Sequence, residues 1–185
     1  MRLKSPANSK ILMTPITLAD GLTAHACPKS GGHWISHEDY MDWLNQHGET
    51  LPEKTDCEVD LTFNANQPAR ICPECGRILI KYKVGHGLDF AVDHCPGCGG
   101  VWLDQNEWEA LQRKNLHDEI HKIFSTHWQS GIRQTELREK FGKVYTKRFG
   151  AEAYEKLRDF HAWLHKRENA AEMLAYLEAE DPYAL

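Results

Sequence analysis

The sequence predicts an α+β fold in which a β-rich first part is followed by a helical second part. Two pairs of cysteines, each in the pattern Cys-Pro-x-Cys, enclose two short apolar segments that are separated by Gly85-His86-Gly87. From about residue 115 onward, apolar residues recur at helical spacing instead. A chain of 185 residues has room for one ordinary domain or two small ones.

The composition is that of a folded protein. Apolar residues make up 41% of the chain, which carries a formal charge of −5. This charge argues against a surface that binds nucleic acid everywhere, so a charged partner would be bound locally. No run approaches the roughly 20 apolar residues of a membrane helix, and the first residues lack the apolar core of a secretory signal. We therefore expect a cytoplasmic protein without a membrane partner.

Four cysteines have the spacing of a structural zinc site. Two C-x2-C pairs, Cys72 with Cys75 and Cys95 with Cys98, are separated by nineteen residues. Each pair can aim two thiolates at one point, so the two pairs complete a tetrahedron around one Zn²⁺ per chain. Because four thiolates leave no open position for water, we expect no catalysis at this metal. Redox-active cysteine pairs and an iron centre are the alternatives.

The residues around the cysteines predict a zinc ribbon followed by a helix. Residues 77–84 and 88–94 read as a β-hairpin with its turn at the two glycines. Asp104 and Glu107 have capping-box spacing, so a helix should begin there. Trp102 is expected to pack against the metal knuckle. These elements define a domain over residues 70–114.

The runs CPECGRILI and DHCPGCGGVWLDQNEWEAL resemble the transcription factor IIB-type zinc-finger family of small bacterial proteins. The signature of that family is CPxCGG-x-W-L-D-x-x-E, and the resemblance covers about residues 70–112. It implies zinc binding at the four cysteines named above, and the family name suggests transcription. It implies no biochemical activity, because function belongs to sites and not to folds.

Residues 1–47 look like a second copy of the ribbon whose metal ligands have been lost. Residues 5–13 align with 72–80, and residues 27–36 align with 95–104. The four ligand positions become Ser5, Asn8, Cys27 and Ser30, and hydroxyls or amides do not replace thiolates on zinc. We therefore predict a degenerate repeat without tetrahedral zinc.

Such a metal-free repeat needs another source of stability. A helix capped by Ser36 and Asp39 should present apolar residues that pack on the rest of the chain. The packing residues are expected to be Trp34, Tyr40, Trp43 and Leu44. The alternative is a new metal site assembled from His25, Cys27, His33 and His37.

The remaining segments are a linker and a helical domain. Residues 48–69 join the two copies, and the alternation over 57–63 indicates one added strand, with Cys57 an ordinary thiol. Residues 115–185 are predicted to form a small helical bundle with two apolar stripes. The first stripe is Leu116, Ile120, Ile123, Phe124 and Trp128; the second is Leu137, Phe141, Val144, Tyr145 and Phe149.

Charge is unevenly distributed along the helical segment. Between Ile132 and Arg148 there are six basic residues against two acidic ones, and every charged residue beyond Arg167 is acidic. A plain interpretation is a solvated basic face beside an acidic end; the functional one is a phosphate-binding surface. The candidate nucleic-acid contacts are Arg77, Lys81 and Lys83 on the ribbon, and Arg138, Lys140, Lys143, Lys147 and Arg148 on the helix.

These features together predict an interaction module and not an enzyme. The zinc ribbon would act as a rigid scaffold that contacts nucleic acid or a transcription-related protein. Alternatives are a protein–protein adaptor, a zinc store or sensor, and an enzyme that uses helical histidines. The histidine pairs His117/His121 and His161/His165 have i, i+4 spacing but no HExxH pattern, so we interpret them as solvated or packing residues. The oligomeric state is not predicted.

Overall fold

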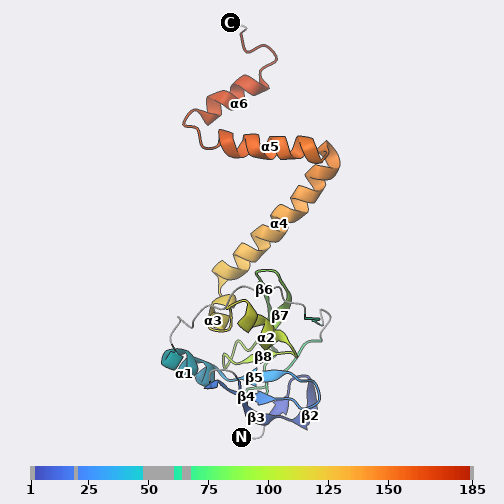
Figure 1. Cartoon of the computed structure of the whole chain (residues 1–185), viewed down its shortest axis with the longest axis vertical. Helices are drawn as coiled ribbons and strands as arrows, with labels where there is room; N and C mark the ends of the chain where they lie inside the picture. The colour runs from blue at the N-terminus through green and yellow to red at the C-terminus, as the bar shows by residue number, and fades with distance from the viewer. Residues whose placement is uncertain (1–2, 19–20, 48–60, 64–67, 184–185) are drawn as a thin grey trace. The chain divides into compact units, whose positions relative to one another are not determined.

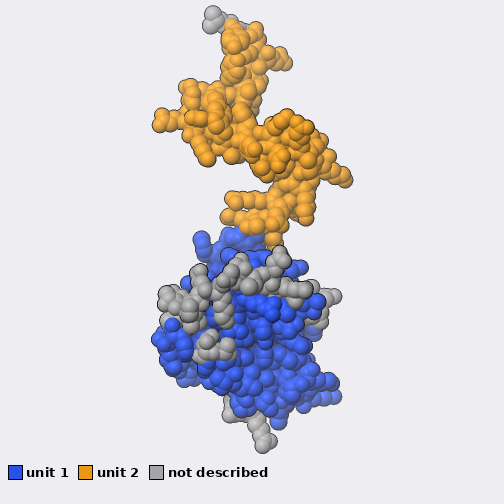
Figure 2. All heavy atoms as spheres, in the orientation of Figure 1, with its two compact units in different colours: residues 1–132 blue, residues 133–185 orange. Residues whose placement is uncertain are grey.

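The computed structural model of the chain describes residues 3–18, 21–47, 61–63 and 68–183 (Figure 1). It divides into two compact units, unit 1 over residues 1–132 and unit 2 over residues 133–185 (Figure 2). The predicted α+β class is confirmed, since an antiparallel β region with a zinc ribbon is followed by helices. The boundary predicted at residue 115 falls inside unit 1, because the first helical segments belong to that unit.

The described residues of unit 1 form eight strands and the helices that cover them. The first half holds β1 (Lys4–Ser5), β2 (Asn8–Leu12), β3 (Thr14–Thr17), β4 (Thr23–Ala26), β5 (His33–Ile35) and α1 (His37–His47). The second half holds β6 (Ile80–Gly85), β7 (Leu88–His94), β8 (Val101–Leu103), α2 (Glu107–Arg113) and α3 (Ile120–Ile123). The next helix, α4 (Thr126–Phe149), starts in unit 1 and continues into unit 2.

The predicted hairpin of the ribbon is confirmed as β6 and β7. Its turn residues Gly85, His86 and Gly87 all have positive φ, which explains the two glycines. Regular pairing begins at Ile80 and not at residue 77, and Ile78 makes an isolated bridge to Ile71.

Six of the strands form one antiparallel sheet in the order β3-β4-β5-β8-β7-β6, while β1 and β2 form a separate hairpin. The two halves of unit 1 meet where β5 pairs with β8. The partners are His33 with Leu103, Trp34 with Trp102, and Ile35 with Val101. Under the alignment of the two halves, exchanging the two strands leaves this set of pairs unchanged, which is the pattern of a two-fold interface.

Two tryptophans at this junction pack tightly against glycines of the opposite half. Trp34 and Trp102 are fully buried. A Cβ on Gly32 would lie 2.3 Å from the Trp102 ring, and a Cβ on Gly100 would lie 2.2 Å from the Trp34 ring. Each half therefore supplies a glycine that admits the tryptophan of the other half.

The helices after β5 and β8 start in different ways. Before α1, the Ser36 hydroxyl accepts the Asp39 N–H at 3.0 Å, as predicted. Before α2, the Glu107 carboxylate accepts the Asp104 N–H at 2.8 Å, but Asp104 uses its own side chain elsewhere. The helix therefore begins at Glu107, after a left-handed Asn106, instead of directly after Asp104.

The core of unit 1 packs both halves together. Tyr40, Trp43 and Leu44 of α1 are buried with Trp108 and Leu111 of α2, as the packing prediction required. Ile120 and Ile123 of the first predicted stripe belong to the same cluster. The Trp128 indole donates to the carbonyl oxygen of Val84 at 2.9 Å, so the start of α4 is fixed to the ribbon hairpin.

The described part of the linker contributes an aromatic contact to this core. Phe63 packs on Phe90 with ring centroids 4.6 Å apart. Of the strand predicted over 57–63, residues 57–60, including Cys57, lie outside the described residues. Residues 61–63 form no strand.

Unit 2 consists of the rest of α4, α5 (Ala151–Leu164) and α6 (Ala170–Glu178). Its second apolar stripe was predicted to pack into a helical core, and this prediction is wrong: all five residues of that stripe are exposed. Leu164 is the one buried residue among the described part of this unit. No helix of the described chain is long and apolar enough to cross a membrane.

Candidate metal centre

The four predicted cysteines converge on one point. Their Sγ atoms all lie within 4.8 Å of one another, with 3.4 Å between Cys72 and Cys98 and 3.3 Å between Cys75 and Cys95. Zn–S bonds of about 2.3 Å place the sulfurs of a tetrahedron about 3.8 Å apart. That distance falls inside the observed range, so the cage fits a tetrahedral thiolate-bound metal ion.

Backbone hydrogen bonds form each cysteine knuckle. The Gly76 N–H donates to the Cys72 carbonyl at 3.1 Å, and the Gly99 N–H donates to the Cys95 carbonyl at 2.9 Å. Both glycines have positive φ, which a side chain would strain. Amide groups also point at the sulfurs, since Cys75 N–H donates to Cys72 Sγ at 3.5 Å and Gly97 N–H to Cys95 Sγ at 3.4 Å.

The electrostatics of the cage favour a bound cation. Burial raises the pKa of Cys72 to about 11 and, together with the neighbouring thiols, raises the pKa of Cys98. Burial also opposes ionisation of Cys95, but amide and thiol hydrogen bonds outweigh it and lower the pKa of that thiol to about 7. Four clustered thiolates need a positive charge between them, which a divalent metal supplies.

A buried ion-pair network lies beside the cage. Arg70 donates to Asp93 and to Asp104, both at 2.7 Å, and Lys81 contacts Asp93 at 2.9 Å. The Trp102 indole donates to the other oxygen of Asp104 at 3.0 Å. The network therefore links residue 70 with β6, β7 and the end of β8, and sequence spacing gave no signal for it. It also occupies Lys81, one of the predicted nucleic-acid contacts.

Glu107 is a further buried acid that sequence analysis treated only as a helix cap. Burial, reinforced by the carboxylates of Asp104 and Asp93, raises its pKa to about 8. The Asp104 N–H and Arg70 act in the opposite direction. A carboxyl group that is protonated near neutral pH therefore adjoins the ribbon.

The second knuckle of the N-terminal half keeps the geometry of the metal knuckle. Cys27 N–H donates to Gly32 O at 2.8 Å and Gly31 N–H to Cys27 O at 2.9 Å, matching the bonds around Cys95. Burial opposes ionisation of Cys27, but hydrogen bonds from the Ser30 and Ser5 side chains and from backbone amides outweigh it and lower its pKa. Hydroxyl groups thus contact this sulfur where the other half has thiols.

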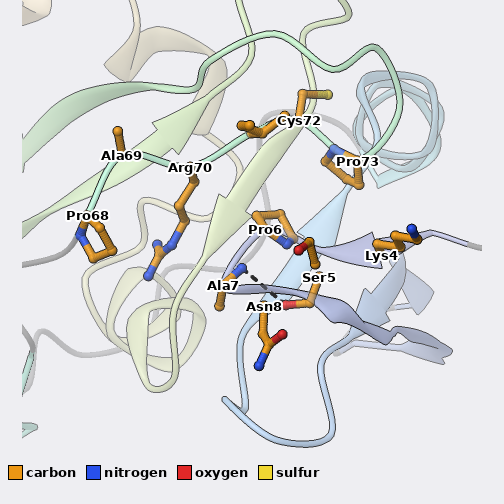
Figure 3. Close-up of a pocket in the computed structure, with 12 residues that line it drawn as sticks. Lys4, Ser5, Pro6, Ala7, Asn8, Pro68, Ala69, Arg70, Cys72 and Pro73 are labelled. Carbon is orange, nitrogen blue, oxygen red and sulfur yellow. Dashed lines mark hydrogen bonds between the residues drawn. The ribbon is translucent and has the colours of Figure 1, made fainter.

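The first N-terminal turn differs in shape from the first metal knuckle. Pro6 and Ala7 make a two-residue turn that pairs Ser5 with Asn8, and the Ser5 hydroxyl accepts the Ala7 N–H at 3.2 Å (Figure 3). Met13 N–H then bonds Leu3 O, as Leu79 N–H bonds Arg70 O. Met13 therefore occupies the position equivalent to Leu79. The sequence alignment had paired Leu79 with Leu12, one residue earlier.

The two halves are also linked at the knuckles. The Trp34 indole donates to the Glu74 carboxylate at 2.9 Å, so the N-terminal half contacts the metal knuckle directly. A hollow of about 580 Å³ lies between the β1–β2 hairpin and residues 68–73 (Figure 3).

The histidine alternatives do not assemble a metal site among the described residues, where the four cysteines are the one group of three or more ligands. His25, Cys27, His33 and His37 do not converge. His117 is buried against Trp43 and Trp108, and His121 lies beside the Tyr40 ring. The rings of His161 and His165 are 4.2 Å apart on an exposed helix.

All eight predicted nucleic-acid contacts are exposed, including Lys81, which also pairs with Asp93. Arg77 and Lys83 lie on the ribbon, and the five basic residues predicted on the helix lie on α4. At 100° per residue, Arg133, Lys140, Lys143 and Lys147 fall within about 80° of one another on α4. Arg138 and Arg148 instead fall among the apolar residues of the second stripe.

The thiolate cage, the two knuckles and the hairpin define a zinc ribbon. Residues 71–114 match the model of the transcription factor zinc-finger family, the TFIIB-type zinc ribbon, which agrees with the resemblance in sequence. No curated protein and no solved structure is significantly similar to the chain.

Proposed function

We propose that the chain is a zinc-stabilised interaction module that binds nucleic acid through the basic face of α4, formed by Arg133, Lys140, Lys143 and Lys147. The observation that supports this role is the alignment of four exposed cations on one helix face of an otherwise acidic protein. Such a face can contact successive phosphates, and the release of counterions would drive binding. Arg77 and Lys83 of the ribbon are candidate additional contacts. The proposal assigns the protein no catalytic role.

Fluorescence anisotropy with labelled single- and double-stranded DNA and RNA tests this function at low and physiological salt. Lys143→Glu/Lys147→Glu should weaken binding at least tenfold and reduce its salt dependence. The reason is that two positive side chains proposed to contact phosphates become negative. Arg158→Glu/Lys166→Glu on unit 2 is the matched control with the same change in charge. Absence of binding at low salt, or equal loss in the control, would remove the nucleic-acid role.

A protein partner is the second candidate. Ile71, Ile78 and Ile80 are 44–65% exposed on the ribbon beside the metal knuckle. An exposed aliphatic group of this kind favours a protein surface over phosphates. If nucleic acid does not bind, the test is whether a protein that co-purifies with the wild-type chain still binds the variant Ile71→Asp/Ile78→Asp. This variant should lose the partner while its metal content stays at one ion per chain.

The ion proposed for the cage is zinc, and the N-terminal half is proposed to be its metal-free copy. Supporting the second point are the exchange symmetry of β5 and β8 and the shared hydrogen bonds of the Cys27 and Cys95 knuckles. Native mass spectrometry should find one Zn²⁺ per chain. Two tightly bound ions would show that the N-terminal half has kept a metal site.

A further inference from the structure

Unit 2 exposes an unusual number of large apolar side chains. Sixteen such residues are exposed in the described chain, and twelve of them lie in unit 2. Eleven of them come from the three helices and Tyr183 follows α6; the full set is Leu137, Phe141, Val144, Tyr145, Phe149, Leu157, Phe160, Trp163, Leu174, Tyr176, Leu177 and Tyr183. Monomeric proteins rarely leave an apolar surface of this extent in water.

The contacts within unit 2 do not cover this surface. Tyr145 meets Tyr154 at 5.9 Å between ring centroids, close to the bend at Gly150. Helix α6 has no buried residue and spans nine residues, too few for a stable isolated helix in water. Its stability therefore requires a surface on which Met173, Leu174 and Leu177 can pack.

The charges of α6 indicate what kind of surface this is. Glu178 ends the helix, Glu180 and Asp181 follow, and the last turn holds no basic residue. Negative charge at a helix C-terminus opposes the helix dipole, so a cationic partner would relieve the repulsion. Helix α4 has the opposite character, with six basic residues against two acidic ones over residues 133–148.

Two of those cations lie within the apolar stripe of α4. Arg138 is three residues before Phe141 and seven before Tyr145, and Arg148 is four residues after Val144. At 3.6 residues per turn, these spacings place both arginines on the apolar face. The face of α4 is thus apolar with positive charges, and the end of α6 is apolar with negative charges.

We propose that this surface binds a second copy of the chain, with α6 of each copy packed on the apolar face of α4 of the other. One chain supplies both complementary surfaces, as a two-fold symmetric dimer requires. Stable interfaces use about 20–30 residues from each side, and unit 2, with its twelve exposed large apolar residues, can provide them. The face of α4 that carries Lys140, Lys143 and Lys147 stays outside this interface, so the dimer does not depend on the nucleic-acid proposal.

Light scattering of the zinc-loaded full-length protein, coupled to size-exclusion chromatography, tests the dimer. The molar mass measured for the wild-type protein should be twice that of one chain, and the mass measured for Phe141→Glu should be that of a single chain. Thr146→Glu is the matched control, because residue 146 lies about 140° around α4 from Phe141 and carries the same change in charge. It should remain a dimer.

Charge reversal tests the pairing of α4 with α6. Arg138→Glu/Arg148→Glu makes both surfaces of one chain negative, and Glu178→Lys/Glu180→Lys makes both surfaces of the other chain positive. Each variant alone should dissociate at least tenfold more readily than wild type, and a mixture should form a heterodimer. A wild-type monomer, a dimer that survives Phe141→Glu, or a mixture that does not associate would each overturn the proposal.

Discussion

At the scale of single residues, two equivalent cysteines are expected to differ completely in importance. Cys95→Ser should abolish stoichiometric zinc binding and unfold unit 1, because a hydroxyl cannot replace a thiolate ligand. Cys27→Ser makes the same change at the equivalent knuckle and should leave one zinc per chain. Inductively coupled plasma mass spectrometry gives the metal content and circular dichroism gives the fold. Loss of zinc in Cys27→Ser would contradict the assignment of the ligands.

Glu107 should give the protein a pH-dependent stability. Its pKa of about 8 in the folded state exceeds the ordinary value of 4.5, so the folded chain holds a proton that the unfolded chain releases. Stability from this group is therefore complete below about pH 4.5 and is lost as the pH rises toward 8. Glu107→Gln should remove the loss, which amounts to at most roughly 1.4 kcal/mol per pH unit.

Urea unfolding of the zinc-loaded protein between pH 6 and pH 8 measures this effect. The free energy of unfolding of Glu107→Gln, relative to wild type, should increase with pH. Restricting the comparison to this range keeps protonation of the zinc ligands small. A difference that stays constant with pH would show that Glu107 is ionised in the folded protein.

The cysteine cluster could be predicted from the sequence because the spacing of the cysteines alone determines that their side chains meet. Two C-x2-C pairs are enough to place four sulfurs together, since each knuckle is closed by its own backbone. The network of Arg70, Asp93 and Asp104 could not be found in this way, because its members are brought together by strand pairing and tertiary packing. The same packing pairs Lys81 with Asp93, a contact that its sequence position did not indicate, and its role toward nucleic acid stays a prediction.

At the scale of elements, the junction of β5 and β8 depends on glycine. Gly100→Ala would place a methyl group 2.2 Å from the Trp34 ring, far inside any normal contact. Because the ring is fully buried, it has little room to move, and the change should destabilise unit 1 by about 1–3 kcal/mol. Tryptophan fluorescence during urea unfolding gives the free energy.

Gly131→Ala is the control for that substitution. Gly131 lies in α4, and a Cβ there meets no atom within 4 Å. Alanine is favoured over glycine inside a helix by about 1 kcal/mol, so this variant should be as stable as wild type or slightly more. Equal destabilisation by both changes would mean that loss of glycine flexibility, and not the clash with Trp34, is responsible.

The elements themselves were largely predictable, and the differences have physical causes. The hairpin around Gly85 and Gly87 follows from local turn chemistry. The start of α2 was misplaced because Asp104 uses its carboxylate on Arg70 and Trp102 and is not free to cap the helix. Helical periodicity identified the second stripe of α4, but periodicity gives only an apolar face and not the surface that covers it.

At the scale of the whole molecule, one metal site should stabilise both halves of unit 1. A metal ion in the cage would join the knuckle before β6 to the knuckle between β7 and β8, and β8 is paired with β5 of the N-terminal half. Removing zinc with a chelator should therefore increase amide hydrogen exchange over residues 23–35 as well as 95–103. Helix α5 belongs to unit 2 and should keep its exchange rates. Continued protection of residues 23–35 would show that the N-terminal half is stable alone.

The pairing of β5 with β8 is the feature of the whole molecule that sequence analysis could not supply. Each strand was recognisable only as part of its own repeat, and no spacing rule links residues 33–35 to 101–103. The internal similarity nevertheless predicted a related pair of ribbons, and the buried Trp34 and Trp102 lie directly opposite each other in the sheet. Local patterns thus identified the parts, while long-range contacts determined their assembly.

The exchange symmetry at β5 and β8 also bears on which positions can vary among sequences. The ligand positions of the two halves should tolerate different substitutions. Ser5 and Ser30 should accept alanine or cysteine. The cysteines at 72 and 98 should accept neither alanine nor serine. Gly32 and Gly100 should both require glycine, since each one leaves room for the tryptophan of the opposite half. A saturation library should therefore show that the two halves differ in the substitutions they tolerate at the ligand positions and agree in those they tolerate at these glycines.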